Sequence, residues 1–435
     1  MKSRSVRVLV QVRVLAQVSV ALSVCVTCRA LIVTGAETPP PIQVESRDWP
    51  WWRGPDRNGI ADARQTPPTQ WSETENIAWR VPVPGRGHSS PVVVGDQVVI
   101  TTADRDRDVQ TVLCFDRVSG HRQWEAVVHA GGQPEKGNEK SSFASSTAAC
   151  DGSLYFVSFL NGDSAWTTAV SRDGKIVWQK EIARFIIHQG YGASPVLQEH
   201  LVIVVADSHA GGAVQAMNRA TGETVWRRDR PKKPNYPSPV VLHVAGRDQL
   251  LLSGCDLVTS LNPLTGDLLW ETAGATTECV TTTVTDGTRI FTSGGYPKNH
   301  IAAVAADGSA RVVWENTMRV YVPSLLARDG HLFGVLDAGI AACLRSDTGE
   351  EVWKERIPGT FSASPVMVGD LIYATSEDGL TYVFRASAEK FELLAKNQLG
   401  ESAFATPTIC GDAIYVRAAT RLDDQRQEFL ACIRK

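Results

Sequence analysis

The chain has 435 residues, 43% of them hydrophobic, and a formal net charge of −3 at pH 7. A chain of this length and composition can bury a large core, and it lacks the basic excess that drives nucleic-acid binding. We therefore expect no nucleic acid among its partners.

The first 36 residues have the order of an export signal. Basic residues come first, a long apolar run follows at residues 14–26, and small residues precede a Pro-rich segment. We expect residues 1–36 to be a signal peptide and the mature protein to be periplasmic or secreted. An uncleaved leader, or lipidation at Cys25, would be the only routes to a membrane.

Residues 37–75 include an unusually aromatic stretch, DWPWWRGPDRNG, which starts at Asp48. Its three tryptophans make it too apolar for a free linker. We expect this Trp-rich N-terminal segment to be docked on the domain that follows, with Trp49, Trp51 and Trp52 covering one face or the closing element. The alternative is that these side chains form a partner-binding epitope.

From residue 76 onwards, tryptophan recurs at intervals of 39 to 54 residues. A period of roughly 40–50 residues indicates a propeller or a solenoid. The recurring pattern is Gly-x-x-x-Trp, with a looser copy at Gly308 and Trp314 and a first tryptophan that stands alone. The series consists of Trp79, Trp124, Trp178, Trp226, Trp270, Trp314 and Trp353.

One repeat can be read at residues 362–379, SASPVMVGDLIYATSEDG. Two β-rich runs joined by Gly369-Asp370 predict a hairpin. In other copies a third run ends at Asp116, Asn218 or Asn262, whose side chains can bond the backbone of the next turn. The Trp-bearing run then follows, and four strands per period make one antiparallel blade.

Eight first strands can be counted, because each follows a Ser-Pro pair or a related pair. These pairs are Ser90-Pro91, Ser146-Thr147, Ser194-Pro195, Ser238-Pro239, Thr282-Thr283, Pro323-Ser324, Ser364-Pro365 and Thr406-Pro407. The seventh repeat has Leu393 or Leu394 in place of its tryptophan, and the eighth has only three strands. We predict an all-β, eight-bladed β-propeller over residues 76–435, closed by pairing residues 76–83 with residues 428–433. The tryptophans are expected to pack between neighbouring blades.

The combination of S-P-V-x-x-G-D, a D-G turn and T-G-x-x-x-W resembles the pyrroloquinoline quinone (PQQ)-like propeller repeat. The resemblance covers about residues 76–433. Two groups share this repeat: quinoprotein dehydrogenases, which bind the quinone and calcium, and non-catalytic propellers such as the lipoprotein subunit of the outer-membrane assembly machine. The resemblance therefore implies an architecture and leaves the cofactor open.

The departures from the dehydrogenases favour the second group. The chain lacks the adjacent cysteine pair that forms a disulfide over the quinone, and about 44 residues per blade leave little room for the insertions that build a cofactor pocket. The longer insertions are residues 130–140 and 227–234. An Asp-rich stretch at residues 104–108 lacks the glycine and glutamate of a calcium loop. No residue matches the catalytic aspartate of that group.

Seven cysteines remain after signal cleavage, an odd number without a metal-like Cys-x-x-Cys. Several occupy matching repeat positions, as Cys114, Cys343 and Cys432 do. We expect them to be small buried residues and not a disulfide framework.

The residue two or three positions before each Ser-Pro pair or related pair should line one mouth of the central channel. Apart from Val280, these residues are aromatic or histidine: His88, Phe143, Tyr191, Tyr236, Tyr321, Phe361 and Phe404. An aromatic concavity of this kind suits a ligand, although a hydrophobic plug without a ligand is the alternative.

We therefore expect an exported, monomeric scaffold without cofactor, metal or catalytic residues, which recognises a protein, an extended peptide or a glycan at this mouth. The alternatives are a PQQ- and calcium-dependent alcohol or sugar dehydrogenase and a carbohydrate-binding propeller.

Overall fold

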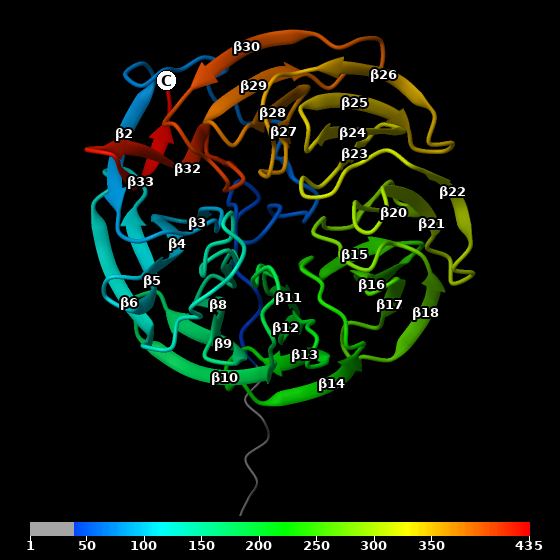
Figure 1. The fold of residues 1–435 in the computed structure, drawn as a ribbon, viewed down its shortest axis with the longest axis horizontal. Coiled ribbons are helices and arrows are strands. Elements are labelled where there is room, and N and C mark those ends of the chain that lie inside the picture. Colours follow the sequence, from blue (N-terminus) through cyan, green and yellow to red (C-terminus); the bar gives the residue numbers. More distant parts are fainter. Residues whose placement is uncertain (1–38) are drawn as a thin grey trace, which may run out of the picture. The chain divides into compact units, whose positions relative to one another are not determined.

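The computed structural model describes residues 39–435, which contain 33 β-strands and no helix. The expected signal peptide, residues 1–36, lies outside the described residues. Eight sheets of four antiparallel strands surround a central axis (Figure 1), which confirms the predicted eight-bladed propeller. Within residues 39–435, no helix is long and apolar enough to cross a membrane.

Each blade is numbered in chain order, and its strands run from the axis outward (Figure 1). Blade 1 has β3 (Val92–Val94), β4 (Gln97–Asp104), β5 (Val109–Asp116) and β6 (Arg122–Ala130); blade 2 has β7 (Ala149–Cys150), β8 (Leu154–Asn161), β9 (Ser164–Ser171) and β10 (Ile176–Arg184). Blade 3 has β11 (Val196–Gln198), β12 (Leu201–Ala206), β13 (Gly212–Asn218) and β14 (Thr224–Arg230); blade 4 has β15 (Val240–Val244), β16 (Arg247–Gly254), β17 (Leu257–Leu261) and β18 (Leu268–Ala273).

The second half of the ring repeats this order. Blade 5 has β19 (Val284–Thr285), β20 (Arg289–Gly294), β21 (His300–Ala305) and β22 (Val312–Asn316); blade 6 has β23 (Leu326–Arg328), β24 (His331–Leu336), β25 (Ile340–Arg345) and β26 (Glu351–Arg356). Blade 7 has β27 (Val366–Val368), β28 (Leu371–Thr375), β29 (Leu380–Arg385) and β30 (Leu393–Gln398); blade 8 has β31 (Thr408–Cys410), β32 (Ala413–Leu422), β33 (Gln425–Ile433) and β2 (Ile77–Val83).

The two middle strands of each blade are buried along most of their length, whereas the outer strands mix exposed and buried positions. The core therefore lies between blades, where the faces of adjacent sheets pack together. The seven cysteines among residues 39–435 are all buried and free, as the sequence predicted.

The tryptophans connect each blade to the next one. Six of the seven donate their indole N–H to a backbone carbonyl in a turn of the following blade. In the case of Trp178 the acceptor is the carbonyl of Arg219, at 2.9 Å. Gly222 of that same turn has φ +71°, and a Cβ added to it would lie 2.7 Å from the Trp178 ring. The glycine of the repeat is therefore required by the tryptophan of the preceding blade.

Trp270 makes the connection differently, because the next blade has the looser spacing between Gly308 and Trp314. Its indole donates to Oε1 of Gln249 in its own blade, at 2.8 Å. The amide of Gln249 then donates to the carbonyl of Ala306 in blade 5, at 2.8 Å. One glutamine side chain thus spans the gap that the longer turn leaves.

The prediction that Leu393 or Leu394 replaces the tryptophan of blade 7 is wrong. The register pairs Val383 with Ala395, which puts Ala395, and not Leu393 or Leu394, at the position that tryptophan holds in the other blades. Ala395 packs against the core cluster that contains Trp71, and the Trp71 ring stacks on Tyr373 with 6.3 Å between centroids. The N-terminal segment thus supplies the indole that blade 7 lacks.

Blade 8 is closed by strands from the two ends of the described chain. β2 pairs antiparallel with β33, with Trp79 opposite Cys432 and Val83 opposite Glu428. This confirms the predicted closure of the ring. Because β2 also carries Trp79, whose indole donates to Arg117 at 3.1 Å, it connects blade 8 to blade 1 as well.

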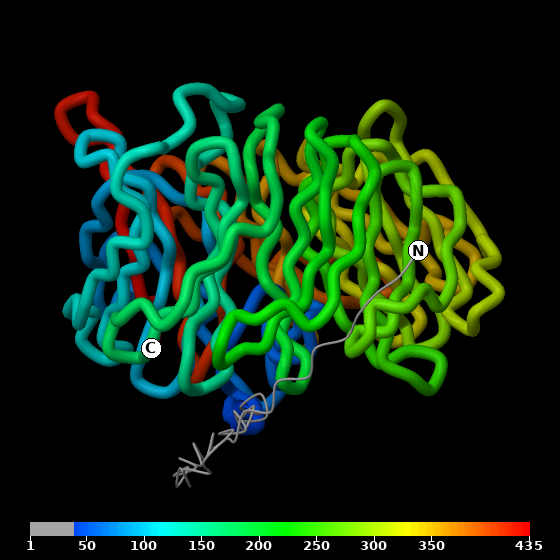
Figure 2. Tube along the Cα trace, turned by 90° about the horizontal axis from the view of Figure 1, so that it is seen from below, coloured from blue at the N-terminus to red at the C-terminus, as the bar shows by residue number. Residues whose placement is uncertain are grey.

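The channel segment, residues 47–66, lies across one end of the central channel (Figure 2, blue), and the red β32–β33 hairpin extends from the other end. The channel segment contacts the inner part of every blade. Its partners in blades 1 to 8 are Val93, Cys150, Leu197, Val241, Thr282, Leu325, Pro365 and Cys410. It also adds β1 (Ile60–Ala61), which pairs in parallel with β27.

Within the channel segment, Trp49 and Trp51 are 1% and 6% exposed, so neither side chain is available as a partner-binding epitope. Arg53 is also buried and donates to the carbonyls of Leu325, Asn58 and Pro365. Burial lowers the pKa of its guanidinium to about 9. The segment is held by backbone acceptors and packing around the whole ring.

We predict that Gly222→Ala destabilises the protein more than Gly246→Ala does. Both glycines have positive φ, so each alanine costs about 1–2 kcal/mol of backbone strain. Nothing lies within 4 Å of a Cβ at Gly246, whereas at Gly222 the Cβ must displace Trp178. The additional loss for Gly222→Ala should be about 1–3 kcal/mol, measured as the free energy of unfolding in denaturant. Equal losses would contradict this account of the repeat.

We predict that deleting residues 76–83 abolishes cooperative melting, because β33 loses its partner and blade 1 loses the Trp79 contact. The measurement is thermal unfolding followed by circular dichroism. A chain lacking only Lys435, which is exposed and follows β33, is the matched control and should melt like the parent. A deletion variant that melts almost unchanged would disprove the closure.

Candidate functional site

A belt of Ser and Thr residues surrounds the axis where the first strands begin. The hydroxyl belt consists of Ser90, Thr147, Ser194, Ser238, Thr282, Ser324, Ser364 and Thr406. In six of the eight steps, the backbone N–H of one member donates to the hydroxyl oxygen of the next, at 2.9–3.0 Å. Where the belt is interrupted between blades 4 and 5, Oγ1 of Thr282 accepts the indole N–H of Trp52 at 2.8 Å.

The belt explains the recurring Ser-Pro signal, because six of the eight hydroxyls are acceptors that join the inner ends of two neighbouring blades. In blade 2 the belt residue is Thr147 and not Ser146. In blades 5 and 6 it is Thr282 and Ser324.

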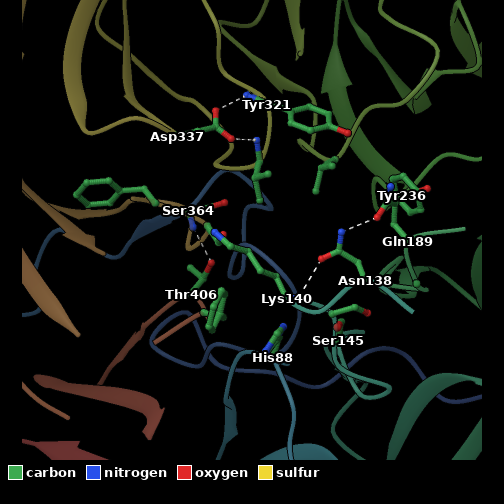
Figure 3. Close-up of a pocket in the computed structure, with 18 of the residues that line it drawn as sticks. His88, Asn138, Lys140, Ser145, Gln189, Tyr236, Tyr321, Asp337, Ser364 and Thr406 are labelled. Atoms are coloured by element: carbon green, nitrogen blue, oxygen red, sulfur yellow. Dashed lines mark hydrogen bonds between the residues drawn. The ribbon is translucent and has the colours of Figure 1, made fainter. Parts of the chain in front are cut away.

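A cavity of about 550 Å³ lies on the axis between the channel segment and the loops at the other end (Figure 3). Trp52 is its lining residue from the channel segment. Five belt residues also line it, namely Thr147, Ser194, Ser238, Ser364 and Thr406. Its size is within the range of small-molecule sites, about 300–1,000 Å³.

Five of the seven residues expected at the mouth line this cavity: His88, Tyr236, Tyr321, Phe361 and Phe404. Val280 lines the cavity as well, whereas Phe143 and Tyr191 do not.

Tyr191 is only 8% exposed, with its hydroxyl donating to the carbonyl of Val205 at 3.1 Å and its ring against Phe185. Phe143 is half-buried beneath the guanidinium of Arg105, 4.3 Å from its ring centroid. The expected placement is wrong for both, because the loops before β7 and β11 turn other residues toward the axis. Ser145 and Gln189 line the cavity there (Figure 3).

One ion pair and one further carboxylate face the cavity. Nζ of Lys140, from the loop before β7, lies 2.7 Å from Oε2 of Glu377, in the turn between β28 and β29. Asp337, in the turn between β24 and β25, accepts the N–H groups of Tyr321 and Val322 at 2.9 and 3.2 Å. Burial raises the pKa of Asp337, while those hydrogen bonds and the nearby Arg319 oppose the rise.

Asp337 and Glu377 were missed by the reading of the sequence, although a signal existed. Each stands two residues before a glycine, in the second turn of its blade (DAG and EDG). In an antiparallel blade this turn lies at the same end as the start of the first strand. The repeat thus places acidic turn residues at the mouth, beside the aromatic residues.

His88 stacks on Phe404, with 4.7 Å between ring centroids and 17° between planes. Its Nε2 is buried and has no hydrogen-bond partner among residues 39–435. Burial, and then the nearby Arg86, Arg417 and Arg426, hold the pKa of His88 well below its ordinary value of 6.5. The imidazole is therefore neutral at physiological pH.

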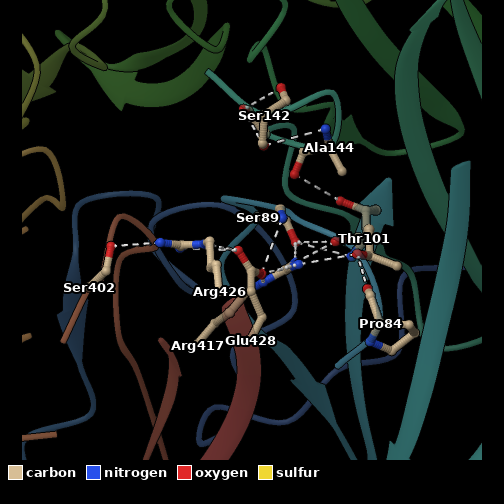
Figure 4. A network of polar contacts seen from close by, with 12 residues as sticks. Pro84, Ser89, Thr101, Ser142, Ala144, Ser402, Arg417, Arg426 and Glu428 are labelled. Carbon is tan, nitrogen blue, oxygen red and sulfur yellow. Dashed lines mark hydrogen bonds and ion pairs between the residues drawn. The ribbon is translucent and has the colours of Figure 1, made fainter. Parts of the chain in front are cut away.

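The positive charge beside His88 belongs to a buried network between blades 8 and 1 (Figure 4). Arg417 and Glu428, 1% and 2% exposed, form an ion pair of 2.7 Å. Arg417 crosses to blade 1 and donates to the carbonyl of Thr101. A Cβ at Gly87 would collide with its guanidinium, which explains the glycine before His88. Because breaking a buried pair leaves a charge without compensation, this network also secures the closing blade.

The lining does not fit a quinone held through calcium. No cysteine lines the cavity, and within residues 39–435 no three His, Cys, Asp or Glu side chains are grouped so as to hold a metal ion. Glu377 is engaged by Lys140 and by the hydroxyl of Ser362, and Asp337 by two backbone N–H groups. Calcium prefers six to eight oxygen ligands, including carboxylates.

The blades, their repeat and their closure define a β-propeller of the PQQ-repeat type. The family model described as outer membrane protein assembly factor BamB matches residues 68–174, 133–355 and 297–390. Since these overlapping matches extend over more than half of the chain, the protein belongs to this family. None of the curated proteins compared matches the chain.

Solved structures of both functional groups are similar to this chain. BamB from Moraxella catarrhalis is 15% identical with a TM-score of 0.58, over 81% of this chain and 96% of that one. The quinohemoprotein alcohol dehydrogenase from Comamonas testosteroni is 12% identical with a TM-score of 0.64, over 89% and 80%. The computationally designed Ika8 protein is 12% identical with a TM-score of 0.58, over 80% and 98%. Such similarity shows the fold alone.

We predict that His88→Phe reduces the loss of stability in acid. The unfolded chain binds a proton at His88 below about pH 6.5, whereas the native state stays neutral until a lower pH. Stability that is present above pH 6.5 is therefore lost as the pH falls, and phenylalanine removes this contribution while keeping a ring against Phe404. Melting temperatures between pH 7 and 5 should fall less steeply for the variant. The same substitution at the exposed His121 is the control, and parallel curves for His88→Phe and the parent would refute the prediction.

Proposed function

We propose that the protein is an exported, non-catalytic recognition scaffold of the cell envelope that holds a ligand in its axial cavity. The observation that carries this proposal is the cavity itself. It is covered by the channel segment at one end, and residues of several blades converge on it with both aromatic rings and polar groups. Concave sites with a few convergent polar groups are the usual form of a ligand site.

A recognition role is favoured over chemistry by the state of the reactive groups. His88 is stacked and neutral, the five belt hydroxyls that line the cavity accept backbone hydrogen bonds, and the seven cysteines of residues 39–435 are buried away from the cavity. Burial raises the pKa of the Cys343 thiol to about 12, so its nucleophilic thiolate is scarce at neutral pH.

Export and the envelope location have two supports. The order of residues 1–36 is that of a signal peptide, and the family description names an outer-membrane assembly factor. On this proposal the mature chain is a periplasmic or secreted monomer. A protein or peptide segment, or a glycan, could occupy the cavity.

The test compares the protein with a Tyr236→Ala/Tyr321→Ala variant on arrays of glycans and of peptides. We expect the ligand captured by the parent to bind the variant at least tenfold more weakly, or about 1.4 kcal/mol. Tyr296→Ala, which removes an exposed tyrosine outside the cavity, is the matched control.

The proposal fails if capture is unaffected by the double substitution. It also fails if the protein, mixed with PQQ and calcium, retains the quinone in stoichiometric amount and reduces a dye with alcohols or aldose sugars. Melting curves of all variants verify that a loss of binding is not a loss of fold.

A further inference from the structure

The charge of the cavity wall limits the ligands that it can accept. Its charged lining residues are Lys140, Arg319, Asp337 and Glu377, whose formal charges cancel. One cation and one anion already form the 2.7 Å pair of Lys140 and Glu377. An anionic ligand would have to approach two carboxylates, and a cationic one two cations. The wall is therefore suited to a neutral molecule.

The hydroxyl belt gives the wall an unusual supply of hydrogen-bond donors. The five belt hydroxyls that line the cavity each accept one backbone N–H, and within residues 39–435 none of them donates a hydrogen bond. A hydroxyl has one O–H to donate besides its acceptor lone pairs. The phenol of Tyr321, which also lines the cavity, likewise has no hydrogen-bond partner in the described part of the chain, and Figure 3 shows its ring along the cavity wall with the oxygen toward the side of Tyr236.

Acceptors stand beside these donors. The carboxylates of Asp337 and Glu377 and the side-chain amides of Asn138 and Gln189 line the same space. Each of their oxygens already accepts one contact within the protein and keeps a second lone pair for a ligand. A ligand that matches this wall must donate and accept hydrogen bonds at many points without carrying charge. Sugar hydroxyl groups do both, since each has a donor and two lone pairs.

Aromatic rings complete the match. Trp52, Tyr321 and Phe404 are half-buried residues that line the cavity. The face of an aromatic ring packs well against apolar C–H groups, and one side of a pyranose ring presents such groups. Rings surrounded by hydroxyls thus suit a sugar better than an ion or a fully apolar molecule.

The cavity is less suited to an extended peptide. Peptides that add to a sheet require free backbone groups at a strand edge. At the belt, the N–H groups of Ser90, Thr147, Ser194 and Ser364 are already donated to neighbouring hydroxyls. The channel segment also covers one end, so a chain cannot pass through. The terminus of a peptide can therefore enter the cavity, whereas an internal segment of a peptide cannot thread through it.

From these observations we infer that the axial cavity binds the neutral terminal sugar of a glycan. This inference rests on the proposed recognition function and names the ligand class of the same site. It assigns hydrogen bonding to the belt and to Tyr321, and stacking to Trp52 and Phe404.

The experiment is titration calorimetry, with a glycan array of diverse neutral terminal sugars to select the probe and cellotriose, maltotriose and chitotriose as starting compounds. We expect saturable binding of a neutral glycan. Tyr321→Phe removes one hydroxyl without leaving a protein partner unsatisfied, and it should weaken binding about 3- to 10-fold. Trp52→Ala should abolish detectable binding. Tyr296→Phe, the same change on the exposed surface, should have no effect.

Trp52→Ala also removes a bond to Thr282, so Tyr321→Phe decides the question if that variant melts early. The inference is overturned if no neutral glycan on the array binds, or if one binds equally well to Tyr321→Phe and to the parent. Should a peptide or PQQ bind in a way that depends on Tyr321, the ligand class is wrong although the cavity is still a binding site. The absence of any ligand that depends on the cavity would remove the proposed function as well.

Discussion

The contact between a tryptophan and the glycine turn of the next blade is the constraint on which the rest of the structure depends. A single four-stranded blade has two faces to bury, and the nearest cover available is the adjacent blade. The indole provides both packing area and a directed N–H, so it fixes the distance between neighbouring sheets and their relative height. Six of the eight junctions between blades carry this contact, and the other two carry a substitute for it, so the ring is stable only as a closed set.

The places where the repeat departs from its own rule support this reading. Gln249 extends the reach of Trp270 across a longer turn, and Trp71 stands in for the tryptophan that blade 7 replaces with Ala395. The two substitutes use different residues, and both restore the connection between neighbouring blades. The hydroxyl belt repeats the principle near the axis, with hydrogen bonds in place of packing.

The fold could be predicted because its information is local and repeated. Gly-x-x-x-Trp and Ser-Pro recur in register, so eight blades and their closure follow from counting. The cavity depends on long-range placement and could be predicted only in part. Tyr191 and Phe143 share the repeat position of Tyr236, yet the path of the loops before their blades turns them away from the axis. Asp337 and Glu377 lie in turns that look ordinary in the sequence, and only the assembly of the blades into a ring brings them to the cavity.

The position of the channel segment has a consequence for how the chain is made. Residues 47–66 leave the ribosome before any of the eight inner strands that they contact, and β2 precedes its partner β33 by nearly the whole propeller. Neither can complete its native contacts until blade 8 has been made. Early blades must therefore wait with unsatisfied faces, and contacts so distant in sequence form slowly. The ring can therefore close only after the whole chain has been made, whatever the order in which its blades form.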